Sequence, residues 1–194
     1  MDLFERYPQL NICKKDIEKA LFLMVDTYKK GGKILVCGNG GSAADADHIV
    51  GELMKGFLKA RKITDKKIPQ ELREKLQGAL PAISLSAHAS LMTATINDND
   101  ADMVFAQQVY GYAKTDDLLI AISTSGNSKN VVNAVKVAKS LGVKAVALTG
   151  ETGGTLKDLA DTTICAPESE TYKIQEYHLP IYHYLCASVE EEIF

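Results

Sequence analysis

The stretch Cys37-Gly38-Asn39-Gly40-Gly41-Ser42 joins an apolar run at residues 33–36 to a helix-like segment that begins near residue 43. Glycines let the backbone turn tightly and approach a ligand closely, and the first turn of a helix offers unpaired N–H groups. A strand, a glycine-rich turn and a helix in this order form a geometry that binds anionic oxygens. The stretch therefore predicts a strand-to-helix turn that holds an anion.

A second turn of similar character, Ser123-Thr124-Ser125-Gly126-Asn127-Ser128, follows the apolar run at residues 118–122 and precedes another helix-like segment. Its hydroxyl groups add hydrogen-bond donors to those of the backbone. Two such turns in a chain of 194 residues indicate that a phosphorylated metabolite is held between them.

Apolar runs alternate with segments of helical periodicity along the whole chain. We expect strands at 33–37, 81–86, 118–122, 143–148 and 162–165, and helices at 15–30, 42–58, 70–76, 89–96, 101–113, 128–141, 155–159 and 172–192. This alternation predicts an α/β fold, a three-layer αβα sandwich whose five-stranded parallel sheet is covered on both faces. Ligands of such sheets bind beyond the carboxyl ends of the strands, where both turns are expected.

No linker or repeat divides the chain, so residues 1–194 are predicted to form one domain. Residues 59–78 are rich in charge and contain Pro69, which is typical of an exposed insertion. A solvated loop is the favoured interpretation of this insertion, and a lid over the substrate is the alternative.

The composition indicates a soluble, cytoplasmic protein. A net charge of −3 argues against a nucleic-acid partner, and no apolar run reaches the roughly 20 residues of a membrane span. The N-terminus does not look like a secretory signal. The cysteines form no Cys-x-x-Cys pair, so reduced thiols are expected, and Cys37 is interpreted as a strand residue rather than a nucleophile.

The first turn does not match either of two common nucleotide-binding motifs well. Residues 38–43 fit the loose pattern G-x-G-x-x-A, but a dinucleotide site also needs a strand that ends in an acid about 20 residues on, where this chain is basic. A triphosphate-binding G-x-x-x-x-G-K-[ST] motif is absent from the sequence. A purely structural turn would leave the hydroxyl-rich second turn unexplained.

Ionisable side chains gather on two of the predicted helices. His48 and Glu52, at i and i+4, share one helix face and can bind a cation or act on a substrate, although such a pair can also be a surface contact. On the last helix, Gln175 and His183 are about 80° apart, whereas His178 and His183 are about 140° apart. The two histidines are therefore not expected to serve one site within one subunit, and a hydrogen-bonded packing role is the alternative for either.

These segments together resemble the sugar isomerase (SIS) domain family, in particular its enzymes that act on heptose phosphates. The matching residues are Cys37-Gly38-Asn39-Gly40-Gly41-Ser42, His48-x-x-x-Glu52, Asn97-Asp98, Ser123-Thr124-Ser125-Gly126-Asn127-Ser128, Leu148-Thr149-Gly150 and Ile174-Gln175-Glu176-x-His178-x-x-x-x-His183. The resemblance implies a flavodoxin- or Rossmann-like sheet. It also implies an isomerase that interconverts sedoheptulose 7-phosphate and D-glycero-D-manno-heptose 7-phosphate through an enediol.

The resemblance also implies roles for individual residues. Glu52 is similar to the family's catalytic base and His183 to its acid. The implied substrate contacts are Asn39, Gly40, Gly41, Ser42, Glu52, Asn97, Asp98, Ser123, Thr124, Ser125, Ser128 and Gln175. The implied ligands of zinc, one ion per subunit, are His48, Glu52, Gln175 and His183. The family further implies a homotetramer with active sites at subunit interfaces, in which the helix at 15–30 takes part in packing.

Two alternatives stay open from the sequence. One is a non-catalytic SIS-domain adaptor of the kind that acts in replication initiation, which can retain the turns. The other is an isomerase of a different sugar phosphate, admitted by the insertion at residues 59–78.

Overall fold

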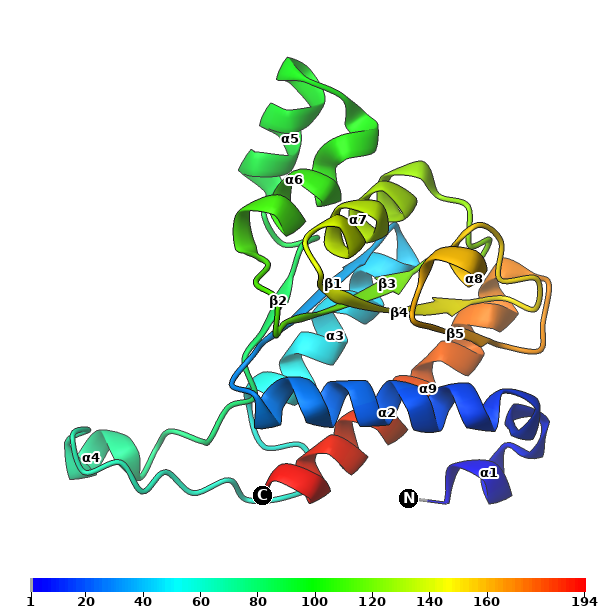
Figure 1. Ribbon diagram of the computed structural model, residues 1–194. Helices are drawn as coiled ribbons and strands as arrows, with labels where there is room; N and C mark the ends of the chain where they lie inside the picture. Colours follow the sequence, from blue (N-terminus) through cyan, green and yellow to red (C-terminus); the bar gives the residue numbers. More distant parts are fainter. Residues whose placement is uncertain (1) are drawn as a thin grey trace.

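The computed structural model describes residues 2–194, in which strands alternate with helices (Figure 1). The strands are β1 (Ile34–Gly38), β2 (Ala82–Ser84), β3 (Leu118–Ile122), β4 (Lys144–Thr149) and β5 (Thr162–Cys165). The helices are α1 (Leu3–Arg6), α2 (Lys14–Lys29), α3 (Gly41–Met54), α4 (Gln70–Arg73), α5 (Ala89–Asp98), α6 (Val104–Tyr112), α7 (Lys129–Ser140), α8 (Leu156–Leu159) and α9 (Thr171–Ile193), with 3₁₀ turns η1 (Pro8–Cys13) and η2 (Ala101–Met103). The predicted elements are present, whereas α1 and η1 were not predicted.

The five strands form one parallel sheet in the order β2-β1-β3-β4-β5, which confirms the predicted fold class. The chain leaves β1 for β2 on one side and then returns to β3 on the other. Ligands of doubly wound sheets bind at such a reversal of strand order. Gly38 and Ile122, the last residues of β1 and β3, are register partners, so the two turns leave the sheet side by side.

The core divides between the two faces of the sheet because successive strand residues point to opposite sides. Ile34 and Val36 belong to the cluster that α2, α3 and α9 complete, whereas Leu35 and Cys37 belong to the cluster under α6 and α7. Figure 1 shows the same layers, with α2 and α9 on one side of the sheet and α7 on the other. The face under α3 and α9 is the one that positions the candidate site.

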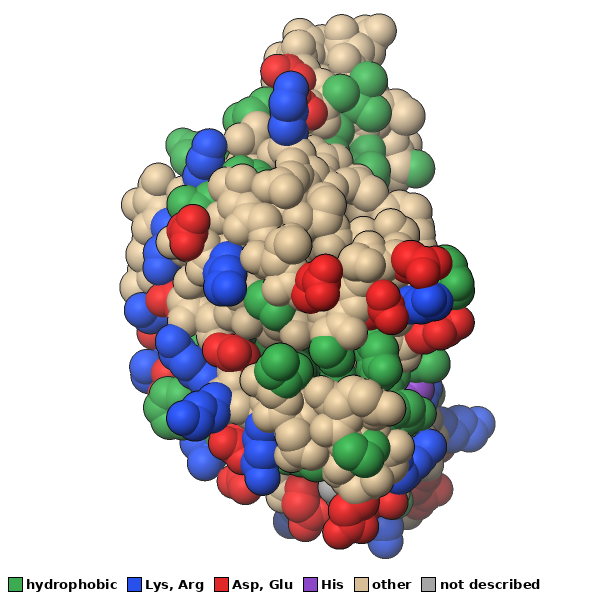
Figure 2. Space-filling view, turned by 90° about the vertical axis from the view of Figure 1, so that its right-hand side faces the viewer, with side chains coloured by type: hydrophobic (Ala, Val, Ile, Leu, Met, Phe, Trp, Pro, Cys, Tyr) green, Lys and Arg blue, Asp and Glu red, His purple; other side chains and the backbone are tan. Residues whose placement is uncertain are grey.

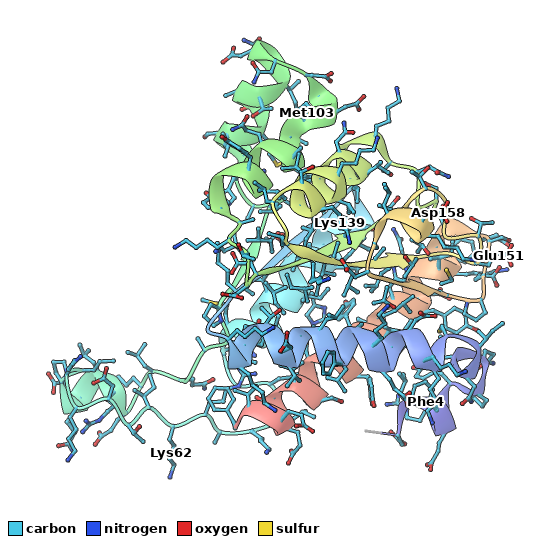
Figure 3. The ribbon with its side chains drawn as sticks, viewed as in Figure 1. Phe4, Lys62, Met103, Lys139, Glu151 and Asp158 are labelled. Atoms are coloured by element: carbon cyan, nitrogen blue, oxygen red, sulfur yellow. The ribbon has the colours of Figure 1, made fainter. Side chains whose placement is uncertain are left out.

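The predicted helix at 42–58 is too long, because α3 ends at Met54 and Lys55 is extended with φ −138°. The prediction of an exposed excursion from residue 59 is also wrong at its start, because Arg61 is 2% exposed. Residues 62–78 do extend away from the body, with α4 at their tip (Figure 1), and Lys62 projects outward from this arm (Figure 3).

The surface carries both signs of charge. On the face that Figure 2 shows, basic and acidic side chains are interspersed, with apolar side chains between them. Within residues 2–194, no helix combines the length and the apolar composition that crossing a membrane requires.

Candidate active site

The two predicted anion turns lie next to each other at the carboxyl ends of β1 and β3. The side-chain amides of Asn39 and Asn130 each donate to the carbonyl oxygen of the other at 2.9 Å, which ties the first turn to the first residues of α7. Helix α3 begins within the first turn, at Gly41, and α7 begins directly after the second, at Lys129. The ends of two helices therefore face the same space, an arrangement that favours an anion.

The second turn is held in shape by its own backbone and hydroxyl groups. Gly126 has φ +66°, and a Cβ there would lie 2.0 Å from the carbonyl oxygen of Gly153, so only glycine fits. Ser123 Oγ donates to Ser128 Oγ at 3.0 Å and lies 3.5 Å from Ser125 Oγ. The hydroxyls are therefore preorganised as a group, and Thr124 is fixed through its carbonyl, which accepts from the N–H of Gly150 at 2.9 Å.

A cluster of ionisable side chains, called here the acid–base cluster, forms where α3 meets α9. Nε2 of His48 lies 3.2 Å from Oε1 of Glu52 and 3.4 Å from Nε2 of His183. The i, i+4 spacing presents His48 and Glu52 on the same face of α3, and packing of α3 against α9 brings His183 to them from 135 positions away. A carboxylate and two imidazoles thus meet in one place.

The electrostatics of this cluster are those of a partly buried, incompletely paired site. Oε2 of Glu52 is buried without a hydrogen bond, although Lys55 Nζ lies 3.5 Å away. Burial, together with repulsion from His48, lowers the pKa of His183, while the charge of Glu52 acts in the opposite direction. These effects together favour the neutral form of the His183 imidazole.

A second layer of side chains lies behind His48. The Tyr182 hydroxyl lies 3.0 Å from Nδ1 of His48 and donates to Oδ1 of Asp45 at 3.2 Å. Burial raises the pKa of Tyr182, and the neighbouring Asp45 adds to the rise. Burial also raises the pKa of Asp45, against the lowering effect of the tyrosine hydrogen bond and of His48.

The end of α3 is anchored by a buried ion pair, in which Arg61 Nε donates to Oε1 of Glu190 at 2.7 Å. The same guanidinium donates to the carbonyls of Leu53 and Glu52 at 2.6 and 3.2 Å, so it caps the last turn of the helix that carries Glu52. The Glu190 carboxylate also accepts the backbone N–H groups of residues 57–59. These bonds fix the loop whose Phe57 ring lies 5.5 Å from the ring of His183.

Other predicted site residues lie apart from this cluster within one chain. Gln175 packs against Gly41, where a Cβ would lie 2.6 Å from its Nε2, and is about 12 Å along α9 from His183. Asn97 and Asp98 are exposed on α5 and are hydrogen-bonded to each other at 2.8 Å. His178 is fully buried, with Nε2 3.2 Å from the carbonyl oxygen of Thr149, which agrees with the prediction that it does not share a site with His183.

The donor atoms of the acid–base cluster are of the type that zinc prefers. Zinc ligands lie about 2.0–2.2 Å from the ion, so neighbouring ligand atoms are roughly 3.3–3.5 Å apart, close to the two separations measured at Nε2 of His48. Across residues 2–194, however, no three His, Cys, Asp or Glu side chains are arranged as a complete metal site. One chain supplies fitting donors and two fitting distances, but not a closed ligand set.

Comparison with known proteins gives consistent matches over nearly the whole chain. The family model described as SIS domain matches residues 10–150. The chain belongs to the SIS domain family. A phosphoheptose isomerase of Aliarcobacter butzleri (strain RM4018) is 42% identical over 184 residues, covering 95% of this chain and 89% of the relative. A phosphoheptose isomerase of Akkermansia muciniphila is 40% identical over 194 residues, covering 100% and 94%.

Solved structures of the SIS family agree with the sequence matches. The structure of a phosphoheptose isomerase from Francisella tularensis has a TM-score of 0.79 at 33% identity, covering 96% of this chain and 90% of that chain. These relatives are enzymes. The alternative of a non-catalytic SIS-domain adaptor, which the sequence left open, is therefore not favoured.

Sequence reasoning missed several residues of this SIS-domain site. Asp45 carried a usable signal, because positions 45, 48 and 52 lie on one face of a helix. No sequence signal pointed to Asn130, Tyr182 or Arg61, because each of them reaches its partner only through tertiary packing.

Proposed function

We propose that this chain is an isomerase that interconverts sedoheptulose 7-phosphate and D-glycero-D-manno-heptose 7-phosphate through an enediol. The observation that carries the proposal is the meeting of Glu52, His48 and His183 near two turns suited to a phosphate. The similarity of the whole chain to phosphoheptose isomerases supports the choice of a seven-carbon sugar.

The two turns hold the phosphate end of the substrate. The hydroxyls of Ser42, Ser123, Thr124, Ser125 and Ser128 and the backbone at residues 39–41 donate to phosphate oxygens. His48 follows Gly41 by seven residues, about 10 Å along α3, so an open-chain sugar phosphate anchored at the turns reaches toward the acid–base cluster. Binding the distant phosphate orients the reacting carbons and offsets the cost of holding the sugar open.

The acid–base cluster moves the proton between adjacent carbons. Glu52 removes the proton from one carbon, and its buried Oε2, which accepts no hydrogen bond, is the atom assigned to this step. His183 donates to the carbonyl oxygen, as a neutral imidazole can do when its pKa is lowered. Such acid–base pairs contribute about 10²–10⁴-fold to a rate.

Zinc, one ion per subunit, is part of the proposal, with His48, Glu52, His183 and Gln175 as its ligands. When bound, the ion polarises the carbonyl oxygen and stabilises the negative charge that develops there. Because Gln175 lies apart from the other three within one chain, we propose that a neighbouring subunit of a homotetramer supplies it. Asn97 and Asp98 on the exposed α5 reach the substrate of a neighbouring subunit in the same way.

The test follows hydrogen exchange in deuterated water. Purified protein is mixed with sedoheptulose 7-phosphate, with and without a chelator, and the product is analysed for deuterium at carbon 2. Deuterium incorporation that chelator abolishes and zinc restores supports both the reaction and the metal, whereas equal rates with and without chelator overturn the metal. Absence of product with this substrate, but turnover of another sugar phosphate, overturns the substrate assignment.

A further inference from the structure

The hydroxyl of Tyr182 lies between Asp45 and His48 behind the acid–base cluster. Its oxygen is 3.2 Å from Oδ1 of Asp45 and 3.0 Å from Nδ1 of His48. Tyr182 is only 2% exposed, and its ring meets the His48 ring edge to face, with centroids 5.3 Å apart and planes at 72°. The phenol is thus held with one fixed hydrogen-bonding partner on each side.

The hydrogen bonds of Asp45 and Tyr182 bear on which ring nitrogen of His48 carries the proton. An ionised carboxylate only accepts hydrogen bonds, and a phenol has a single proton to donate. With that proton given to Asp45, the phenol oxygen accepts from His48, whose proton then resides on Nδ1. The other ring nitrogen, Nε2, is left with a free lone pair, because the partner of one imidazole nitrogen fixes the tautomer of the ring.

We infer that Asp45 and Tyr182 are positioning residues that fix His48 as the Nδ1–H tautomer and aim the lone pair of Nε2 into the acid–base cluster. That atom faces Oε1 of Glu52 at 3.2 Å and Nε2 of His183 at 3.4 Å. The second oxygen of Glu52 is buried without a hydrogen bond. Several electron-rich atoms therefore converge on one point, and a cation bound at that point would stabilise them.

The identity of that cation as zinc rests on the proposed function, whereas the tautomer does not. Partners of this kind behind a metal-binding histidine raise its basicity and orient its ring, and their loss typically costs 10–100-fold in metal affinity. Tyr182 contributes through His48 and is not itself assigned contact with the substrate.

The chain offers a matched pair of variants for the test, Tyr182→Phe and Tyr184→Phe. Tyr184 is on the same helix and half-buried, and its ring packs edge to face on Phe4 at 5.8 Å. The His48 tautomer is measured by long-range proton–nitrogen NMR on the full-length, zinc-free protein. We expect the proton on Nδ1 in the wild type and in Tyr184→Phe, and a shift of population toward the Nε2–H tautomer in Tyr182→Phe.

Zinc affinity, measured by competition with a chelator, provides a second readout. We expect Tyr182→Phe to bind zinc about 10–100-fold more weakly and Tyr184→Phe to match the wild type. A wild-type proton on Nε2, or an unchanged tautomer in Tyr182→Phe, overturns the inference. If Tyr182→Phe does not fold, Asp45→Ala keeps the phenol but removes the acceptor of its proton, so the same tautomer shift is expected. If His48 of the wild-type protein carries its proton on Nδ1 but the protein binds no zinc, the inference is supported and the zinc site of the proposed function is overturned.

Discussion

The two turns proposed to bind phosphate (residues 37–42 and 123–128, called here the phosphate turns) and the acid–base cluster are built in different ways. The second turn has four hydroxyls within the six residues 123–128, and its internal hydrogen bonds span at most five positions, as between Ser123 and Ser128. The acid–base cluster joins His48 to His183 across 135 positions. The hydroxyl groups of the second turn are therefore brought together by local chain geometry, whereas the acid–base cluster exists only when α3 and α9 are packed together.

The two regions also differ in how fully their polar groups are paired. In the second turn the hydroxyls of Ser123 and Ser128 are hydrogen-bonded to each other, and in the first turn the Asn39 amide is paired with that of Asn130 in α7. Oε2 of Glu52 in the acid–base cluster and Oδ2 of Asp45 behind it are buried without a hydrogen bond. Buried carboxylate oxygens without hydrogen bonds are costly to stability, which is expected of groups kept for chemistry. The comparison therefore predicts that the turns govern binding and that the cluster governs turnover.

Glu52→Gln is expected to have the largest effect. The amide keeps the shape of the side chain but cannot accept a carbon-bound proton, so kcat falls by about 10²–10⁴-fold while KM changes little. Steady-state kinetics with sedoheptulose 7-phosphate measure both constants. Glu18→Gln, an exposed position on α2, is the control that retains activity. A wild-type kcat in Glu52→Gln would remove the carboxylate from the mechanism.

Glu190→Gln tests the long-range support of the acid–base cluster. Glu190 is 1% exposed and pairs with a fully buried guanidinium, that of Arg61, so removing its charge is expected to destabilise the protein by about 3–5 kcal/mol. Glu191→Gln is the matched control, because Glu191 forms an exposed pair with Lys59 at 2.9 Å worth less than about 1 kcal/mol. Urea unfolding of both variants measures the difference in the free energy of unfolding. Equal losses in the two variants would show that the buried ion pair stabilises the protein no more than the exposed one.

His178→Gln tests whether the buried histidine of α9 is structural. Burial lowers the pKa of His178 to about 4 from an ordinary value of 6.5, so the unfolded chain binds a proton that the folded protein excludes. The contribution of the buried, neutral imidazole to the free energy of unfolding is complete above pH 6.5. It is lost, by about 3 kcal/mol in total, as the pH falls toward the pKa of His178 in the folded protein. Between pH 7 and pH 4, the free energy of unfolding is expected to fall less steeply in His178→Gln than in the wild type. His88→Gln is the control, and a wild-type slope in His178→Gln would contradict the assignment.

Ser125→Ala is expected to have the smallest effect and to act on binding. Loss of one hydrogen bond to a charged phosphate costs about 1.5 kcal/mol or more, which raises KM by roughly 10-fold and leaves kcat within a few-fold. Ser140→Ala, at the far end of α7, serves as the comparison variant. A fall in kcat without a rise in KM would place Ser125 with the acid–base cluster instead of the phosphate turns.

The sequence was sufficient wherever structure depends on neighbours along the chain. β3 was predicted with the ends it has in the structure, because its five apolar residues are bounded by Asp117 and the serine-rich turn. The prediction is wrong at residues 55–61, because the sequence places Arg61 in a solvated loop whereas the structure buries it. Its partner Glu190 is 129 positions away, and no local pattern distinguishes a buried arginine from an exposed one.

By itself, the sequence determined the parallel sheet, the two turns at its carboxyl edge and the shared helix face of His48 and Glu52. These features follow from hydrophobic periodicity, glycine geometry and helical spacing, which act over a few residues. The tertiary structure alone decided that it is His183 rather than His178 that meets His48, that Gln175 lies apart, and that Tyr182 lies behind the cluster. These contacts depend on how α9 packs against α3 and the sheet, and that packing is set by the burial of the whole core rather than by any one segment.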